Sequence, residues 1–222
     1  MRYTKQLTTQ YKAMRQNDLF DVSQDDQAPS CELIKLDDQE LILHPDFLDD
    51  DVATAILLQL RQELSWQQPC LAIAGKSVPI PRLQVWMGDK DSRYTYSGKT
   101  FDAEPWHPKI TVLKTLVEQL TDNPFNSALC NLYRNGQDSV AWHADDETEL
   151  GNSPCVASFS LGEARTFQLK RKDKQGSLKK IELTHNSLLI MKPGVQEHWL
   201  HRVPKTLQAK GTRINITFRL LR

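Results

Sequence analysis

The sequence predicts an α+β protein that is mainly β, with two helices followed by a β sandwich or barrel. Two segments, 49–64 and 108–121, repeat apolar residues at helical spacing. From Leu129 onward, short alternating or apolar runs are separated by turn residues, as in sandwiches and barrels. The 222 residues, 39% of them hydrophobic, are enough to bury one core. We therefore expect a loosely ordered polar tail at 1–30 and a single domain at 31–222.

The composition argues against a membrane or secreted protein. No apolar run approaches the roughly 18 residues that would span a bilayer, and the N-terminus lacks the apolar segment of a signal peptide. The four cysteines form no CxxC pair, which is typical of buried thiols in a reducing compartment. We therefore expect a soluble cytoplasmic protein, nuclear if the source is eukaryotic, and nothing in the sequence requires more than a monomer.

The formal net charge of zero hides an asymmetry along the chain. From Arg165 to the C-terminus there are 14 Lys and Arg against 3 Asp and Glu, whereas the preceding part has 14 against 25. The C-terminal part is therefore strongly basic and the rest strongly acidic. A basic surface of this kind fits a polyanionic partner.

The N-terminal half supplies two strands and two helices. Segments 32–36 and 40–43 alternate or run apolar around Asp37-Asp38, as short strands do. Asp49-Asp50-Asp51 provides acidic first-turn residues for one helix, and Pro108 suits the first turn of the other. The apolar stripes that should face the core are Val52, Ile56, Leu60 and Leu64 in the first helix, and Ile110, Leu113, Leu116, Val117 and Leu120 in the second.

Between the helices, residues 71–106 form the least regular segment, rich in Gly, Pro and aromatic residues. Aromatic faces and Lys or Arg side chains are what single-stranded nucleic acid contacts require. The segment therefore fits a lid that stacks on a planar group and holds phosphates, although an ordinary packed loop with half-buried aromatics has the same composition. The residues concerned are Gly75, Lys76, Arg82, Trp86, Tyr94 and Tyr96.

The C-terminal half reads as successive strands that no helix interrupts. Asn135-Gly136 signals a hairpin between 129–133 and 140–145, which places Asn131 and Tyr133 on a face near the second strand. Further strands are expected at 156–161, 166–169, 181–183, 187–191 and 195–203.

Six Lys and Arg residues crowd the hairpin at 170–180 around Gly176. Like charges at a hairpin tip usually mark a solvated turn, but a phosphate-binding loop has the same composition. The sequence leaves this alternative open.

A candidate metal site begins with His143-Ala144-Asp145. Side chains alternate along a strand, so His143 and Asp145 would point the same way and could bind one ion. A second histidine would complete the two-histidine, one-carboxylate arrangement of non-haem Fe(II) oxygenases. Of His185, His198 and His201, the last shares its strand phase with apolar Trp199 and is the choice, with a buried histidine satisfied by the backbone as the alternative.

The last strand, Arg213-Ile214-Asn215-Ile216-Thr217-Phe218-Arg219, alternates polar and apolar residues, so one face should pack on a core. The polar face either meets solvent or binds a ligand. Its two arginines lie about 20 Å apart along an extended strand, so they could clamp one small ligand only if the strand bends or their side chains converge. They could instead serve the two carboxylates of one dicarboxylate, and the spacing alone leaves this open.

Together these motifs resemble the AlkB family of Fe(II)/2-oxoglutarate dioxygenases, over about residues 66–220. The resemblance rests on Asn131-Leu132-Tyr133, His143-Ala144-Asp145, His201 within 198–204 and the Arg-x-Asn-x-Thr-x-Arg strand. It implies a double-stranded β-helix, or jelly roll, with a core at about 129–220 and a nucleotide-recognition lid at about 66–106.

The resemblance also implies roles for individual residues. Fe(II) would be held by His143, Asp145 and His201. 2-Oxoglutarate would chelate the iron near Asn131 and Arg219, and its distal carboxylate would meet Arg213 and Tyr133, with Asn215 and Thr217 between. The substrate base would meet the lid residues Gly75, Lys76, Tyr94 and Tyr96 on one side, Tyr96 stacking on it against His143, and Asp146 or Glu147 at its exocyclic amine. The basic hairpin at 170–180 would contact phosphates.

The implied activity is O2-dependent demethylation of bases such as 1-methyladenine and 3-methylcytosine in DNA or RNA, releasing formaldehyde, succinate and CO2. In family members that act well on duplexes, a bulky aromatic precedes the Gly-Lys pair, whereas this chain has Ala74. We therefore expect a preference for single strands. The alternatives are a 2-oxoglutarate-dependent hydroxylase of a protein or small molecule, and a non-catalytic jelly-roll module that binds nucleic acid.

Overall fold

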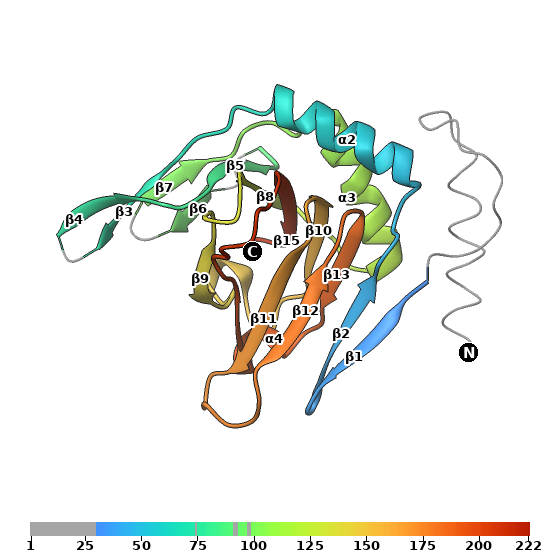
Figure 1. Cartoon of the computed structure of the whole chain (residues 1–222), viewed down its shortest axis with the longest axis vertical. Helices are drawn as coiled ribbons and strands as arrows, with labels where there is room; N and C mark the ends of the chain where they lie inside the picture. Colours follow the sequence, from blue (N-terminus) through green and yellow to red (C-terminus); the bar gives the residue numbers. More distant parts are fainter. Residues whose placement is uncertain (1–29, 74, 91–92, 97–98) are drawn as a thin grey trace.

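Two antiparallel β-sheets packed face to face form the centre of the computed structural model (Figure 1), which describes residues 30–222 except 74, 91–92 and 97–98. The large sheet has the strand order β1-β2-β13-β10-β15-β8-β5 and the small sheet the order β12-β11-β14-β9. The large sheet consists of β1 (Glu32–Leu36), β2 (Gln39–His44), β5 (Leu83–Gly88), β8 (Ser127–Tyr133), β10 (Val156–Gly162), β13 (Ser187–Met191) and β15 (Arg213–Arg219). The small sheet consists of β9 (Val140–His143), β11 (Arg165–Arg171), β12 (Lys179–Leu183) and β14 (Trp199–Val203).

The path of the chain through these sheets is that of a jelly roll. From β8 to β15, the strands alternate between the large and small sheets, except that β11 and β12 are neighbours in the small sheet. Large apolar side chains of both sheets, such as Phe167 and Trp199 from the small sheet and Leu189 from the large one, fill the space between them. The prediction of a mainly β protein with a jelly-roll core is confirmed.

Two helices cover the outer face of the large sheet (Figure 1), and both were predicted from their apolar spacing. The first, α2 (Asp50–Glu63), begins at Asp49, whose side chain accepts hydrogen bonds from the backbone N–H groups of Asp51 and Val52. The second, α3 (Pro108–Thr121), has proline in its first turn. Their buried residues, Ala53, Ile56 and Leu60 in α2 and Ile110, Leu113 and Val117 in α3, form one core with the sheet.

The hairpin predicted at Asn135-Gly136 is wrong, because β8 and β9 belong to different sheets. Gly136 does not have the positive φ that a tight hairpin turn would require. A Cβ at Gly136 would instead lie 2.8 Å from the carbonyl oxygen of Thr206, so glycine here permits close approach of a distant loop. Asp138 accepts hydrogen bonds from the backbone N–H and guanidinium of Arg134 and closes the connection that carries the chain between the sheets.

Two short helical segments also depart from the prediction of uninterrupted strands. Thr148–Leu150 forms one 3₁₀ turn, and Val195–His198 forms the short helix α4 before β14 begins at Trp199. Gly194, with φ of 94°, starts this turn in a conformation that suits glycine. His198 therefore lies on a helical turn and not on the strand that carries His201.

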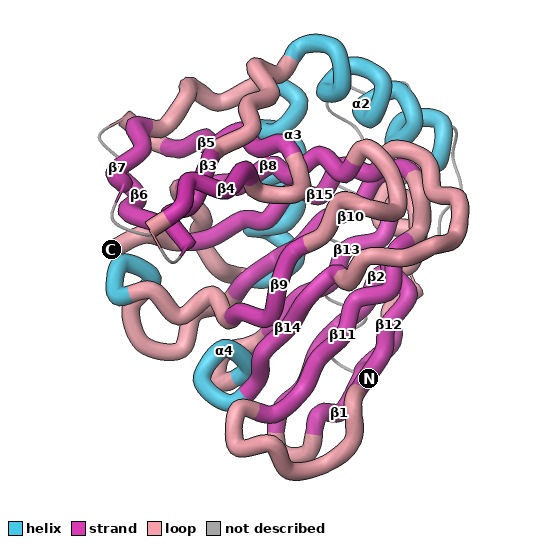
Figure 2. The backbone as a smooth tube through the Cα atoms, turned by 60° about the vertical axis from the view of Figure 1, so that its left-hand side comes forward, coloured by secondary structure: helices cyan, strands magenta, loops and turns pink. Residues whose placement is uncertain are grey.

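Two hairpins extend from the sandwich on the side of β9 (Figures 1 and 2). One joins β3 (Cys70–Ile73) to β4 (Lys76–Pro79), and the other joins β6 (Arg93–Tyr96) to β7 (Lys99–Asp102). Among the helices that the structure describes, none is long and apolar enough to cross a bilayer.

Candidate metal centre and adjoining cavities

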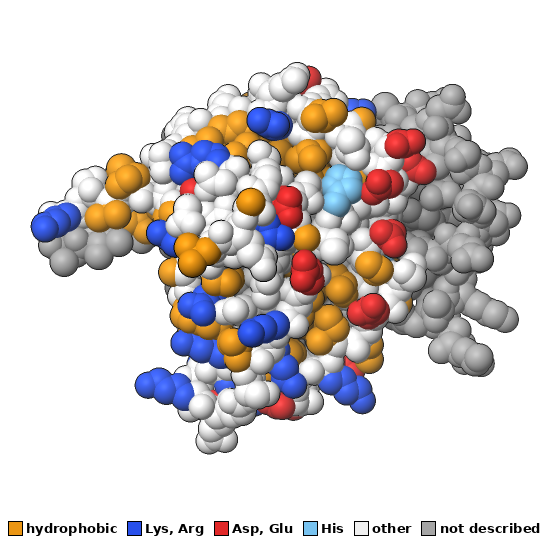
Figure 3. Space-filling model, viewed as in Figure 1, with side chains coloured by type: hydrophobic (Ala, Val, Ile, Leu, Met, Phe, Trp, Pro, Cys, Tyr) orange, Lys and Arg blue, Asp and Glu red, His pale blue; other side chains and the backbone are white. Residues whose placement is uncertain are grey.

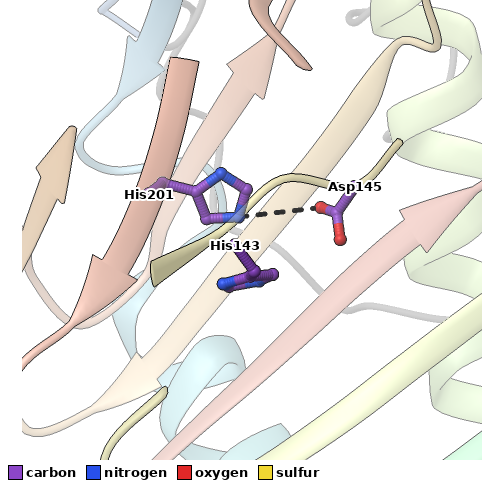
Figure 4. A group of neighbouring side chains, drawn as sticks. All are labelled: His143, Asp145 and His201. Atoms are coloured by element: carbon purple, nitrogen blue, oxygen red, sulfur yellow. Dashed lines mark ion pairs between the residues drawn. The ribbon is translucent and has the colours of Figure 1, made fainter. Parts of the chain in front are cut away.

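His143, Asp145 and His201 come together at one end of the sandwich (Figure 4). His143 ends β9 and pairs across the sheet with His201 of β14, and their ring centroids are 4.2 Å apart. Asp145 approaches from the loop after β9, with its Oδ2 3.8 Å from Nε2 of His201. One ligand atom from each residue lies within 4.8 Å of the others, so the three fit around one ion with its remaining positions open.

The local backbone that achieves this differs from the strand expected across 140–145. Between the pairs His143–His201 and Val140–Val203 the register shifts, so that Ala141 and Trp142 together oppose Arg202 in a β-bulge. The strand then ends at His143, and Asp145 belongs to the following loop. Simple strand alternation is therefore the wrong explanation for the proximity of these side chains.

Polar contacts orient two of the three side chains. Nδ1 of His143 donates to the carbonyl oxygen of Ala141 at 2.9 Å, which leaves Nε2 as the atom available to a metal. Oδ1 of Asp145 accepts a hydrogen bond from the guanidinium of Arg219, and its backbone N–H donates to Oε1 of Gln196 at 3.0 Å. Gln196 lies on α4, is fully buried, and was not found by sequence reasoning because no motif contains it.

The electrostatics of the site keep these groups ready to bind a cation. Burial raises the pKa of Asp145, but the cation of Arg219, with His201 and His143 acting in the same direction, outweighs burial and holds that pKa below its usual value. Burial lowers the pKa of His201 to about 3, and His143 and Arg219 act in the same direction while Asp145 opposes them. A carboxylate and a neutral imidazole are the forms that coordinate metals.

An inner cavity of about 50 Å³ extends from this site between the two sheets. Arg213 pairs with Tyr133 and Asn215 with Asn131 across β15 and β8, so their side chains share the face that lines this cavity. All six residues that the resemblance assigns to the cosubstrate line it: Asn131, Tyr133, Arg213, Asn215, Thr217 and Arg219.

The two arginines of β15 lie at opposite ends of the inner cavity. Arg219 contacts Asp145, whereas Arg213 lies with its Cζ 5.1 Å from the ring centroid of Tyr133. Nη2 of Arg213 donates to Oγ of Ser160 at 2.9 Å, and its Nε and Nη1 donate to no described residue. A buried guanidinium with unused donors fits one carboxylate of a dicarboxylate whose other end reaches the metal.

An outer cavity of about 140 Å³ opens beside His143 and Asp145, whereas His201 lines only the inner cavity. It shares His143, Asp145 and Arg219 with the inner cavity, so the candidate metal position lies where the two meet. Its remaining walls are mostly apolar, with Pro69, Leu71, Ile80, Val85, Trp86, Leu129 and Val140, and carry polar groups of Gln67, Arg82, Gln84, Glu104 and Glu147. Such a cavity suits a planar group with a few hydrogen-bonding atoms.

The residues expected to contact the substrate fall in different places. Glu147 lines the outer cavity, whereas Asp146 is exposed and forms an ion pair with Nζ of Lys172 at 2.7 Å. Gly75 and Lys76 are exposed on the β3–β4 hairpin. Tyr94 and Tyr96 lie on β6, but their side chains, like Ala74 as a whole, lie outside the described part of the structure.

One wall residue of the outer cavity, Glu104, was missed. Its backbone bridges to Met87 on β5, and nothing in the surrounding sequence marks it as a site residue. Only the pairing with β5 places it beside the cavity, and the sequence carries no signal for that pairing.

A jelly roll with two histidines and a carboxylate at its open end, beside a cavity with a buried arginine, defines the class of non-haem iron oxygenases that use a 2-oxo acid cosubstrate. Residues 40–219 match the 2OG-Fe(II) oxygenase superfamily. The chain belongs to this superfamily and, within it, to the AlkB family, which confirms the resemblance seen in the sequence. Fe(II), 2-oxoglutarate and O2 are thus its cofactors, as predicted.

Relatives support the family assignment, and solved structures support the fold. The chain is 43% identical over 186 residues to alpha-ketoglutarate-dependent dioxygenase alkB homolog 3 of Homo sapiens, covering 80% of this chain and 64% of that protein's length. It is 35% identical over 177 residues to DNA oxidative demethylase ALKBH2 of Mus musculus, covering 75% of this chain and 74% of the relative. The structure of OsALKBH1 superposes with a TM-score of 0.64 at 20% identity over 85% of this chain and 100% of that one. A prolyl hydroxylase of Trichoplax adhaerens superposes with a TM-score of 0.57 at 16% identity over 82% of this chain and 83% of the other, and both structures show the fold alone.

Proposed function

We propose that this chain is an Fe(II)- and 2-oxoglutarate-dependent dioxygenase that removes methyl groups from bases such as 1-methyladenine and 3-methylcytosine in single-stranded DNA, with RNA as a further substrate. The observation that carries the proposal is that two cavities meet at His143 and Asp145, which form a candidate metal site together with His201 of the inner cavity. The inner one suits a dicarboxylate and the outer one a base. The name DNA oxidative demethylase of the mouse relative supports the same activity.

In this proposal, His143, Asp145 and His201 hold Fe(II), and Arg213 with Tyr133 binds the distal carboxylate of 2-oxoglutarate. When bound, the iron, 2-oxoglutarate and O2 supply the oxidant that hydroxylates the N-methyl group as 2-oxoglutarate becomes succinate and CO2, and the hydroxymethyl group then leaves as formaldehyde. The inner cavity would hold the cosubstrate, and the outer cavity, which also reaches His143 and Asp145, would admit the methyl group.

The outer cavity recognises the base. Glu147 accepts the exocyclic N–H of the base, and the apolar walls shield the reacting methyl group from water. As the resemblance implies, Tyr96 of the lid would stack on the base against His143. The methylated atom lies on the pairing edge, so the base must leave any duplex before it can enter, and methylation that blocks pairing lowers that cost.

The proposal is tested by formaldehyde release from oligonucleotides that carry 1-methyladenine or 3-methylcytosine, in the presence of Fe(II) and 2-oxoglutarate. We expect turnover by the unmodified chain and none by His143→Ala, because that variant loses a metal ligand. Release of succinate without formaldehyde from any methylated oligonucleotide would contradict nucleic-acid demethylation and favour hydroxylation of a protein or small molecule.

The same assay with matched single-stranded and duplex oligonucleotides tests the strand preference. We expect faster turnover of the single strand, because the small side chain of Ala74 cannot fill the gap that a flipped base leaves in a duplex. Exchange of Ala74 for phenylalanine should raise duplex turnover selectively. Faster turnover of the duplex by the unmodified chain would contradict the preference.

A further inference from the structure

We propose that the outer face of the small sheet binds the phosphates of the nucleic-acid strand that flanks the lesion. This inference rests on the proposed function and adds a binding surface outside both cavities. The surface, here called the basic face, consists of the side chains of Lys170 and Arg202, which contact the half-buried ring of Trp142, and of Lys180 on β12.

The basic hairpin at 170–180 contributes only part of its charge, because carboxylates of this chain neutralise Arg171 and Lys172, whereas Lys170 and Lys180 belong to the basic face. Arg171 forms ion pairs with Asp37 at 3.2 Å and Asp173 at 2.8 Å. Lys172 forms an ion pair with Asp146 at 2.7 Å. A phosphate that bound these side chains would have to compete with carboxylates already in place.

The cations of the basic face are different, since Lys170, Lys180 and Arg202 form no ion pair with any acidic group in the described ranges. Lys180 lies opposite Gln168 of β11, and Gln168 lies opposite Arg202 of β14. Lys180, Gln168 and Arg202 therefore form a row across the strands. Nε of Arg202 donates to Oε1 of Gln168 at 2.8 Å, which fixes the guanidinium over the sheet. Glu182 of β12, which lies opposite Thr166 of β11, is an acidic side chain on the same face.

Trp142 holds two of these cations in place. Nζ of Lys170 and Cζ of Arg202 each lie 4.4 Å from its ring centroid. Cation–π contact at this distance restrains both long side chains, so less conformational entropy is lost when a phosphate binds them. The indole thus prepares a cationic pair for an anion.

The β-bulge at Ala141 and Trp142 connects this face to the reaction site. The bulge lets Trp142 pack between Lys170 and Arg202 on the outer face, while His143, the next residue, lines both cavities. Figure 2 shows β9, β14, β11 and β12 side by side below the β3–β4 and β6–β7 hairpins. A nucleic-acid strand that leaves the outer cavity past the edge of β9 would therefore pass over the basic face.

The charge distribution of the surface fits this path. In Figure 3, Lys and Arg side chains gather over β9, β11 and the β11–β12 loop, whereas Asp and Glu side chains gather toward α2 and β2. On this face of the molecule, Lys and Arg side chains are therefore concentrated over the small sheet. Evenly spaced phosphates are the anions that best match a row of cations along a sheet.

The test measures binding of a fluorescein-labelled, unmodified single-stranded oligonucleotide as a function of salt. We expect the double variant Lys170→Gln/Arg202→Gln to lower the slope of log Kd against log salt by about 1.4, since each phosphate contact to a single strand contributes about 0.7. The Kd at about 0.15 M salt should rise roughly 10-fold for the same reason. Lys180→Gln, which leaves the Trp142 contacts intact, should lower the slope by about 0.7.

The matched control is Lys192→Gln/Lys210→Gln, which removes the same formal charge from two lysines that pair with Glu40 and Glu163. We expect its salt slope to equal that of the unmodified chain. If the basic-face variants also keep the slope, the inference is wrong. If the unmodified chain demethylates no oligonucleotide, the proposed function itself fails, and a test of 2-oxoglutarate binding separates that failure from a misfolded protein.

Discussion

Exchange of Asp145 for asparagine is expected to lower turnover at least about 100-fold by weakening Fe(II) binding. The carboxylate is one of three groups whose ligand atoms lie within 4.8 Å of one another, and a neutral amide oxygen is a much poorer ligand for the ion. The exchange also removes the anion to which Arg219 donates in a buried ion pair. Loss of one partner from such a pair is strongly destabilising.

Two measurements separate these effects: Fe(II) bound at equilibrium dialysis, and the melting temperature without metal. We expect both to fall for Asp145→Asn, and neither for Asp46→Asn, which changes an exposed carboxylate in the loop before α2. Unchanged Fe(II) binding by Asp145→Asn would show that this carboxylate is not a ligand. A lower melting temperature alone would then assign Asp145 to the ion pair with Arg219.

Local sequence patterns were sufficient wherever a single element decided the outcome. The helix over 108–121 follows from proline at its start and from apolar residues at helical spacing, and α3 has those bounds. In β15, the alternation also predicted one apolar face, and Ile214, Ile216 and Phe218 do join the core with the helices. The polar face lines the inner cavity and not solvent, which the pattern alone left open because exposed and cavity-lining strands alternate alike.

Contacts between distant segments account for what the sequence did not reveal. Asn135-Gly136 looks like a hairpin turn, but the glycine is needed because the Thr206 carbonyl passes close to it. Gln196 supports Asp145 from a helical turn that no periodicity marks. The resemblance likewise assigned Asp146 or Glu147 to the base, and only the ion pair of Asp146 with Lys172 distinguishes the two.

Exchange of Arg213 for methionine is expected to raise the KM for 2-oxoglutarate by about 10- to 100-fold, while kcat at saturating cosubstrate changes little. Nε and Nη1 of Arg213 have no partner among the described residues, so they are available to the distal carboxylate. Hydrogen bonds to a charged group are worth about 1.5–3 kcal/mol, and about 1.4 kcal/mol is tenfold in affinity. The metal ligands are not touched, which is why kcat should survive.

The melting temperature of the same variant should not fall, and this distinguishes a cosubstrate-binding arginine from a structural one. Burial lowers the pKa of Arg213, which reflects the cost of keeping its cation away from water. Replacement of a buried ion by an apolar side chain of similar size is often neutral or stabilising. Without 2-oxoglutarate, Arg213→Met should therefore melt no lower than the unmodified chain. The control Arg61→Met, at an exposed position of α2, should have the melting temperature and the KM of the unmodified chain. A lower melting temperature together with an unchanged KM would instead make Arg213 a support for Tyr133 and Ser160, and the distal carboxylate would have to bind elsewhere.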